Sequence, residues 1–299
     1  STRAEKITTA FVKQNCTLFL SCVIQNPRFS NQSKQRLVSK RATWGSTPLF
    51  EKKATDRVVR ALREQIAAAY LAKQQEALGR STRTRKRDFG DKTDDANFAG
   101  KRRAKDCTLW LCEGDSAKAL VVAGLKALGK TGRDLHGVFP LKGKLLNVRH
   151  AAPSKIQANK EIMNLIRCLG LRLNARLCSE QPVRSLRYGS VCIITDQDPD
   201  GSHIKGLVMN ALARFYPKGL AVSGFLKIFH TPIVRAASRG HARDFYSLPE
   251  FEEWRDGLDT TPKTKYYKGL GSWTSPDARR MFSNMVGNHI VAMEPATAE

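Results

Sequence analysis

The chain twice places a short apolar run directly before a group of acidic residues and then a longer apolar pattern. The first unit joins CTLWLC at 107–112 to SAKALVVAGLKAL at 116–128, and the second joins SVCIIT at 190–195 to HIKGLVMNALARFY at 203–216. The short runs are typical of buried strands, and the longer runs have helical spacing. A strand followed by a helix, repeated, predicts an α/β fold around a parallel sheet.

Acidic residues stand between each predicted strand and its helix. Glu113 and Asp115 follow the first strand, and Asp196, Asp198 and Asp200 follow the second. Ligands of open α/β sheets bind beyond the carboxyl ends of the strands, so we expect both groups to meet in one crevice. In an extended chain Asp196 and Asp198 face the same way and repel each other unless a cation lies between them. Oxygen donors without His or Cys predict a Mg²⁺ site.

A calcium loop and helix capping are two competing roles for these acidic residues. The spacing D-x-D-x-D-G also opens an EF-hand calcium loop, but the twelfth position of such a loop is Glu and here it is Leu207. The β-branched run before the acids is also a strand rather than the helix of an EF-hand. Helix capping explains Asp115 or Asp200 well, but it does not explain five acids at two strand ends.

The charge of the chain indicates a polyanionic partner. Lys and Arg number 51 against 27 Asp and Glu, a formal net charge of +24. Such a surplus repels itself unless a polyanion neutralises it, so nucleic acid is the first partner to consider. No apolar run approaches the roughly 20 residues of a bilayer span, so we expect a soluble globular protein without a membrane partner. The seven cysteines form no C-x-x-C pair, which favours a reducing compartment and no zinc site.

The segments outside the two strand–helix units give a coarser prediction. Residues 16–29 are apolar up to a proline and predict a strand, and residues 55–78 have the apolar spacing of an amphipathic helix. Residues 80–106 carry basic clusters at 83–87 and 101–105, typical of a solvated linker, a localisation signal or a DNA-contacting loop. Residues 225–236 predict a strand pair or an extended arm, and residues 244–258 a turn into a helix.

Several motifs together resemble a known family. EGDSA at 113–117 with DQDPDG at 196–201 resembles the Toprim metal-binding signature. Four further segments resemble type IIA DNA topoisomerases of the eukaryotic topoisomerase II branch: NPRFSNQSKQRL at 26–37, DDANFAG at 94–100, GVFPLKGKLLNVR at 137–149 and KYYKGLGSWTS at 265–275. FYSLPEFEEW at 245–254 is similar to that branch as well. The resemblance implies a Toprim fold, a Rossmann-like parallel sheet flanked by helices, preceded by the last strand and long helix of a transducer domain.

The resemblance also implies a division of the chain. Residues 1–50 correspond to the C-terminal part of the transducer domain, and residues 51–106 to a connecting helix and basic linker. The Toprim metal-binding domain is expected at 107–290, and 291–299 would lead toward a winged-helix domain. The chain begins with Ser1 rather than Met, which suggests a fragment or a processed product. The resemblance implies that it starts inside the transducer domain and stops before the catalytic tyrosine.

Site residues follow from the resemblance position by position. Glu113 matches the general acid/base, and the implied metal ligands are Glu113, Asp196, Asp198 and Asp200. Gln32 and Lys34 match the loop that reaches the γ-phosphate of ATP. The residues implied in DNA binding are Lys142, Lys144, Asn147, Arg149, His203, Lys205 and Lys268. The implied cofactors are Mg²⁺, for which Mn²⁺ or Ca²⁺ can substitute, and ATP in the full-length enzyme.

The implied activity is ATP-dependent passage of one DNA duplex through a transient double-strand break in another. Without its tyrosine and ATP site the fragment is expected to be inactive alone, and the complete enzyme to be a nuclear homodimer, with mitochondrial or viral forms as alternatives. A Toprim subunit of a split topoisomerase, or a Toprim primase or nuclease, is the alternative function. The chain departs from the family pattern at Ser33, Lys142 and Pro199, and the effect of Pro199 on the metal site is left open.

Overall fold

A computed structural model describes residues 8–14, 16–17, 19, 21–45, 49, 51–81, 93–173, 181–283, 285 and 289–293. The chain divides into two compact units, Ser1–Gln74 and Gln75–Glu299, and each is described by itself. The basic cluster predicted at 83–87 lies outside the described residues. Among the helices of the described part, none combines the length and apolar character needed to cross a membrane.

The first unit is built on one long helix. It contains α1 (Thr9–Gln14), η1 (Arg41–Thr43) and most of α2 (Lys52–Ser81), which confirms the helix predicted at 55–78 and extends it at both ends. Phe11 of α1 packs edge-on against Tyr70 of α2, with ring centroids 5.3 Å apart.

The strand predicted at 16–29 is wrong. Its described residues form no strand, and only an isolated bridge joins Phe29 to Leu37. A strand needs a neighbouring strand to satisfy its backbone groups, and none is present among the described residues of this unit. The side chains of Phe19 and Val23 are accordingly 91% and 96% exposed. Apolar composition alone therefore gave a misleading signal.

The second unit contains the predicted parallel sheet. Its strands lie in the order β2-β1-β3-β4-β8, with β8 antiparallel to β4 and the other pairs parallel. The strands are β1 (Thr108–Glu113), β2 (His136–Leu141), β3 (Ser190–Ile194), β4 (Leu226–Phe229) and β8 (Ile290–Ala292). The α/β fold class is therefore confirmed, and β1 and β3 are adjacent, so their carboxyl ends meet at one edge.

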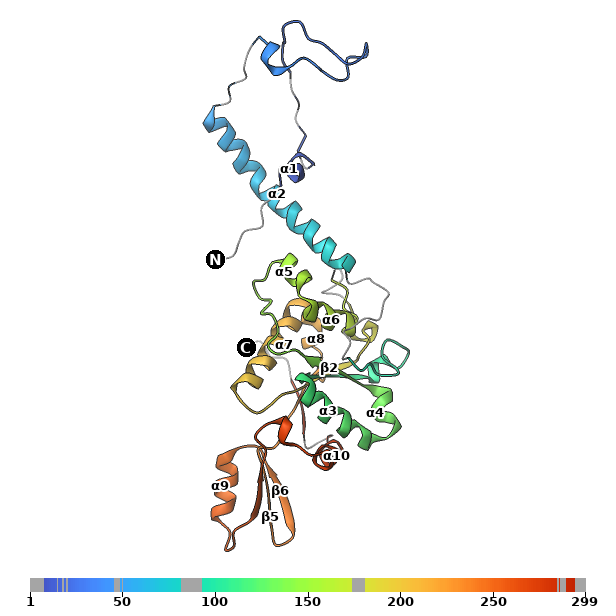
Figure 1. Cartoon of the computed structure of the whole chain (residues 1–299), viewed down its shortest axis with the longest axis vertical. Coiled ribbons are helices and arrows are strands. Elements are labelled where there is room, and N and C mark those ends of the chain that lie inside the picture. Colours follow the sequence, from blue (N-terminus) through green and yellow to red (C-terminus); the bar gives the residue numbers. More distant parts are fainter. Residues whose placement is uncertain are drawn as a thin grey trace. The chain divides into compact units, whose positions relative to one another are not determined.

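Helices cover both faces of this sheet (Figure 1). One face packs against α6 (Lys160–Leu169) and α7 (Pro199–Phe215), and the other against α3 (Gly114–Leu125) and α10 (Ser275–Ser283). On the second face Trp110 packs against Phe229 and Phe282, with ring centroids 5.5 and 5.0 Å away. The remaining short helices are η2 (Ala104–Asp106), η3 (Lys126–Leu128), α4 (Lys130–Leu135), α5 (Pro153–Ala158), η4 (Val183–Ser185), α8 (Pro217–Leu220) and η5 (Leu270–Ser272).

A smaller antiparallel sheet follows the parallel one in the chain. It consists of β5 (Val234–Ser238), β6 (His241–Phe245) and β7 (Lys263–Tyr266), in the order β6-β5-β7, with α9 (Leu248–Asp256) alongside (Figure 1). Phe245 packs against Phe251 and Trp254 to form its core. The strand pair predicted at 225–236 is thus two strands in different sheets. From β7 the chain returns directly to the edge of the parallel sheet.

Candidate metal-binding and catalytic site

Glu113 lies at the carboxyl end of β1 and is also the N-cap residue of α3. Its side chain makes no capping hydrogen bond, and its Oε2 atom is buried without a hydrogen-bond partner among the described residues. Burial raises the pKa of Glu113, and the nearby charges of Asp196 and Asp198 raise it further. A hydrogen bond from the Asp196 backbone opposes these shifts. A partly buried carboxylate beside two others is destabilising unless a proton or a cation joins it.

Asp196 is held by a segment far away in the sequence. It follows β3, and its Oδ1 accepts a hydrogen bond of 2.6 Å from the backbone N–H of Leu270. The segment comes so close because residue 269 is glycine. Its φ of +145° strains other residues, and a Cβ there would lie 2.7 Å from Asp196 Oδ2. The KGLG stretch therefore forms one wall of the site.

Asp198 and Asp200 belong to the start of α7. The side chain of Asp198 caps the helix by accepting a 2.7 Å hydrogen bond from the Gly201 N–H, and Pro199 takes the first helical position. The exposed side chain of Asp200 forms a 2.8 Å ion pair with Lys144, which lowers the pKa of that carboxyl group. Since α7 begins inside the D-x-D-x-D-G stretch, there is no twelve-residue calcium loop here.

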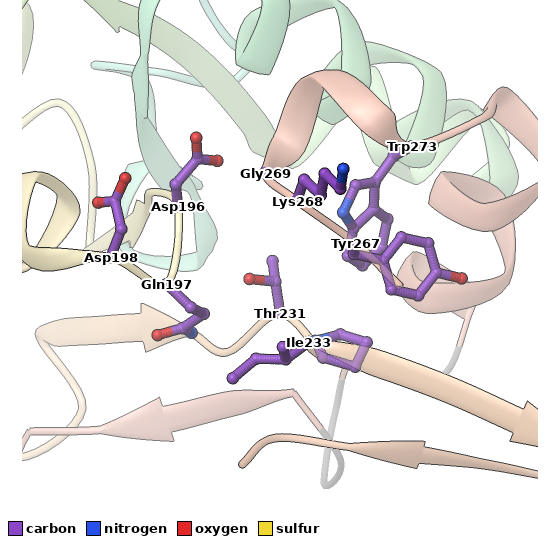
Figure 2. Close-up of a pocket in the computed structure, with 10 residues that line it drawn as sticks. Asp196, Gln197, Asp198, Thr231, Ile233, Tyr267, Lys268, Gly269 and Trp273 are labelled. Carbon is purple, nitrogen blue, oxygen red and sulfur yellow. The ribbon is translucent and has the colours of Figure 1, made fainter. Parts of the chain in front are cut away.

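Asp196 and Asp198 line a small open cavity of about 100 Å³ at this edge. Figure 2 shows the two carboxylates on one side, and Tyr267, Lys268 and Trp273 on the other. The floor comes from the connection between β4 and β5. Sequence reasoning assigned no role to Gln197 and Trp273, although both lie in quoted motifs, and it missed Thr231, Pro232 and Ile233, which no local pattern marks.

In the part of the chain that the structure describes, no three His, Cys, Asp or Glu side chains are arranged so that they could hold a metal ion together. The chemistry of the donors, rather than a completed ligand set, is what fits a divalent cation. The fit rests on the orphaned oxygen of Glu113 and on the mutual repulsion of Glu113 with Asp196 and Asp198. All three donors are carboxylates, the ligands that Mg²⁺ prefers. Asp200 differs from them, because it is exposed and paired with Lys144.

The residues expected to bind DNA lie in the second unit. Lys142, Lys144, Asn147 and Arg149 follow the carboxyl end of β2, where the Lys142 N–H donates to Glu161 and the Arg149 N–H donates to Asn147 Oδ1 at 3.1 Å. The Arg149 carbonyl accepts a 2.9 Å hydrogen bond from Arg214 of α7. This loop is therefore fixed at the same edge of the sheet as Glu113.

Three further residues predicted to bind DNA, two lysines and a histidine, lie near the acidic residues. His203 and Lys205 lie on α7, and Lys268 lines the cavity beside Asp196 and Asp198. Burial lowers the pKa of Lys205, and the charge of Asp198 opposes that shift. The edge thus combines a carboxylate cluster with a basic rim.

Gln32 and Lys34 lie in the first unit. They belong to a turn in which the Lys34 N–H donates to the Asn31 carbonyl at 3.2 Å, and Lys34 has a φ of +53°. The side chain of Asn31 accepts a 3.4 Å hydrogen bond from the Gln35 N–H. Their predicted contact with ATP stays a prediction.

Two family models match this chain. Residues 108–229 match the Toprim domain, and residues 229–299 match the C-terminal associated domain of TOPRIM. The fold and the acidic edge are thus those of a protein with a Toprim domain.

The chain is related, over most of its length, to one segment of eukaryotic DNA topoisomerase 2. DNA topoisomerase 2, mitochondrial, of Dictyostelium discoideum is 41% identical over 292 residues, covering 94% of this chain and 22% of that protein. DNA topoisomerase 2-beta of Gallus gallus is 42% identical over 288 residues, covering 94% and 17%. The chain thus spans about a fifth of these relatives.

A solved structure supports the same relationship. The Plasmodium falciparum topoisomerase II DNA-binding, cleavage and re-ligation domain superposes with a TM-score of 0.63 at 45% identity, covering 68% of this chain and 27% of that one. The resemblance read from the sequence is confirmed.

Proposed function

We propose that this chain is the metal-bearing part of an ATP-dependent type IIA DNA topoisomerase, which passes one duplex through a transient double-strand break in another. The observation that carries the proposal is the buried, unpartnered Oε2 of Glu113 beside Asp196 and Asp198. The basic rim around it and the names of the relatives, all DNA topoisomerase 2, point to DNA as the substrate.

Glu113 acts as the general acid and base in this proposal. Breaking a phosphodiester bond requires a proton for the departing 3′-oxygen, and resealing requires its removal. A carboxyl group whose pKa is raised by burial and by neighbouring carboxylates holds a proton closer to neutral pH than an exposed one. Its place at the end of a sheet strand, rather than on a loop, fixes that proton in space.

Glu113, Asp196 and Asp198 would hold Mg²⁺, with Mn²⁺ or Ca²⁺ as substitutes. When bound, the ion supplies a Lewis acid that draws charge from the non-bridging phosphate oxygens. The Leu270 N–H and the Gly201 N–H orient Asp196 and Asp198 for this task. Asp200 takes part indirectly, since its ion pair with Lys144 places a cation at the edge of the acids.

The basic rim positions the DNA backbone without reading its sequence. The ammonium groups of Lys142, Lys144 and Lys268 act as point charges that attract the DNA phosphates. The hydrogen-bonded loop at 147–149 helps to fix the position of the DNA backbone on the protein. Such contacts predict affinity that falls steeply with salt. The proposed DNA is double-stranded and of no particular sequence.

The remaining parts of the reaction lie elsewhere in the proposed enzyme. The tyrosine nucleophile and the ATP site belong to its winged-helix and ATPase domains, and Gln32 and Lys34 reach the ATP γ-phosphate. The complete enzyme is a homodimer in the nucleus, with a mitochondrial location as the alternative. The 299 residues alone bind DNA and metal but do not relax supercoiled plasmid.

The test is Glu113→Gln in a complete enzyme that contains this chain. Cleavage and resealing are expected to fall by about 10²- to 10⁴-fold, the usual contribution of a general acid/base, with DNA affinity unchanged. Asp259→Asn, which changes an exposed acid in the connection between α9 and β7, is the control and retains full activity. Full relaxation activity in Glu113→Gln would refute the role of Glu113.

A further inference from the structure

Asp277 collects more hydrogen bonds than its local role in the chain requires. It is the third residue of α10 and completes a capping box with Thr274, whose N–H donates to Asp277 Oδ2 at 3.0 Å. Two further groups from outside the helix also donate to it. Lys265 Nζ lies 2.6 Å from Oδ2, and the Tyr267 hydroxyl lies 3.1 Å from Oδ1.

These two extra donors lie in β7 and directly after it, in the stretch that leads into the wall of the acidic site. Lys265 is in β7, and Tyr267 is three residues before Leu270, whose N–H donates to Asp196. Tyr267 is buried, with its ring against Trp273 at a centroid distance of 4.7 Å. The segment between the anchor at Asp277 and the contact at Asp196 is therefore only Lys268 and Gly269.

The close approach at Gly269 makes this anchoring matter. A Cβ at residue 269 would lie 2.7 Å from Asp196 Oδ2, so the backbone already touches the carboxylate. Because protein interiors are closely packed, a small shift at one end of a short segment moves its other end as well. Leu270 adds a second attachment, since its buried side chain packs in the same cluster as Ala278 and Met281 of α10.

We propose that Asp277 is a positioning residue for Asp196: through Lys265 and Tyr267 it holds the 267–270 segment so that the Leu270 N–H orients the Asp196 carboxylate. The charge of Asp277 is well suited to the task. Burial alone would raise its pKa, but the hydrogen bonds from Lys265 and Thr274 lower it, so the group stays an anion that attracts its donors. The link to metal binding rests on the proposed function, whereas the link to Leu270 does not.

The direct test is the exchange of the Leu270 amide hydrogen with solvent, followed by NMR on the 299-residue chain without divalent cations. In Asp277→Asn we expect this exchange to accelerate at least tenfold, and in Tyr267→Phe about threefold, because the N–H separates more often from Asp196. The Gly201 amide, bonded to Asp198, is the internal reference and keeps its rate. Ser247→Ala, which removes the cap of α9, is the matched control and leaves Leu270 unchanged.

A Leu270 exchange rate in Asp277→Asn no faster than in Ser247→Ala would overturn the proposal, as would equal acceleration at Gly201. A second measurement then connects the two claims. If the wild-type chain binds Mn²⁺ by calorimetric titration, Tyr267→Phe is expected to weaken that binding severalfold. Absence of Mn²⁺ binding in the wild type would count against the proposed function and leave the positioning result standing.

Discussion

Lys144 Nζ lies 2.8 Å from Asp200 Oδ1, which joins a residue expected to bind DNA to one expected to bind metal. Both side chains are exposed, so the pair contributes little to stability. Its consequence is electrostatic. Asp200 neutralises one cation of the basic rim at the point where a phosphate would approach.

Asp200→Asn is therefore expected to raise the affinity of the chain for a short DNA duplex, about threefold at low salt, because Lys144 is released and one negative charge is removed. Fluorescence anisotropy at several salt concentrations measures the effect. Lys144→Ala is the companion variant, and its slope of log affinity against log salt should fall by about one. Weaker binding in Asp200→Asn would show that Asp200 orients Lys144 for DNA rather than competing with it.

Glu113→Gln is expected to stabilise the chain at neutral pH in the absence of divalent cations, by about 1 kcal/mol, since it removes a charge that burial and the charges of Asp196 and Asp198 disfavour. Urea unfolding compares the two proteins. Addition of Mg²⁺ should stabilise the wild type but not the variant, because binding to the native state adds to its stability. A variant less stable than the wild type without metal would mean that the hydrogen bond from the Asp196 backbone outweighs this penalty.

His136 makes stability depend on pH. Its Nδ1 accepts a 3.1 Å hydrogen bond from the Trp110 indole, and burial, assisted by Lys227, lowers the pKa of His136 from 6.5 to about 4. Between pH 6.5 and pH 4, His136 is therefore protonated in the unfolded chain but neutral in the folded chain. The free energy of unfolding consequently decreases as the pH drops from 6.5 toward 4. From pH 7 to pH 5 the wild type should lose about 1 to 2 kcal/mol more than His136→Gln, whose amide oxygen can still accept from Trp110. Equal losses in urea unfolding would contradict this assignment.

A glycine substitution in α3 tests the packing of α3 against α10, and one in α7 is its control. A Cβ at Gly124 would lie 2.2 Å from the Phe282 ring, so Gly124→Ala should destabilise the chain by about 1 to 3 kcal/mol. Gly206 lies within α7 with nothing within 4 Å of an added Cβ, so Gly206→Ala should stabilise it by about 0.5 to 1 kcal/mol. Thermal unfolding of both variants measures the difference. Similar melting temperatures would rule out the close contact between Gly124 and Phe282.

Local patterns predicted the parts of the fold whose signal is local. The apolar runs at 107–112 and 190–195 are β1 and β3, and their shared edge gathers Glu113, Asp196 and Asp198. The helix expected from 203 begins earlier, at Pro199, because Asp198 caps it and proline suits its first position. Local spacing predicted the helix itself, whereas the capping geometry determined where it starts.

Long-range pairing was beyond the reach of the sequence. Leu270 contacts Asp196 from 74 residues away, and no periodicity marks a backbone N–H as the partner of a carboxylate. The prediction for residues 16–29 was wrong for a related reason. Their apolar composition favours a strand, but the described part of the first unit contains no strand with which they could pair. The sequence pattern therefore located the acidic residues, but only the tertiary structure shows that the Leu270 N–H orients Asp196.

The central claim, that Glu113 and Asp196 hold a divalent cation, is tested most directly by calorimetric titration of the 299-residue chain with Mg²⁺ and Mn²⁺. The wild type and the control Asp259→Asn should bind equally, and Glu113→Gln and Asp196→Ala should each bind at least tenfold more weakly, which is about 1.4 kcal/mol of binding free energy per site. Equal affinity in all four proteins would contradict the account, because the cation would then be bound elsewhere.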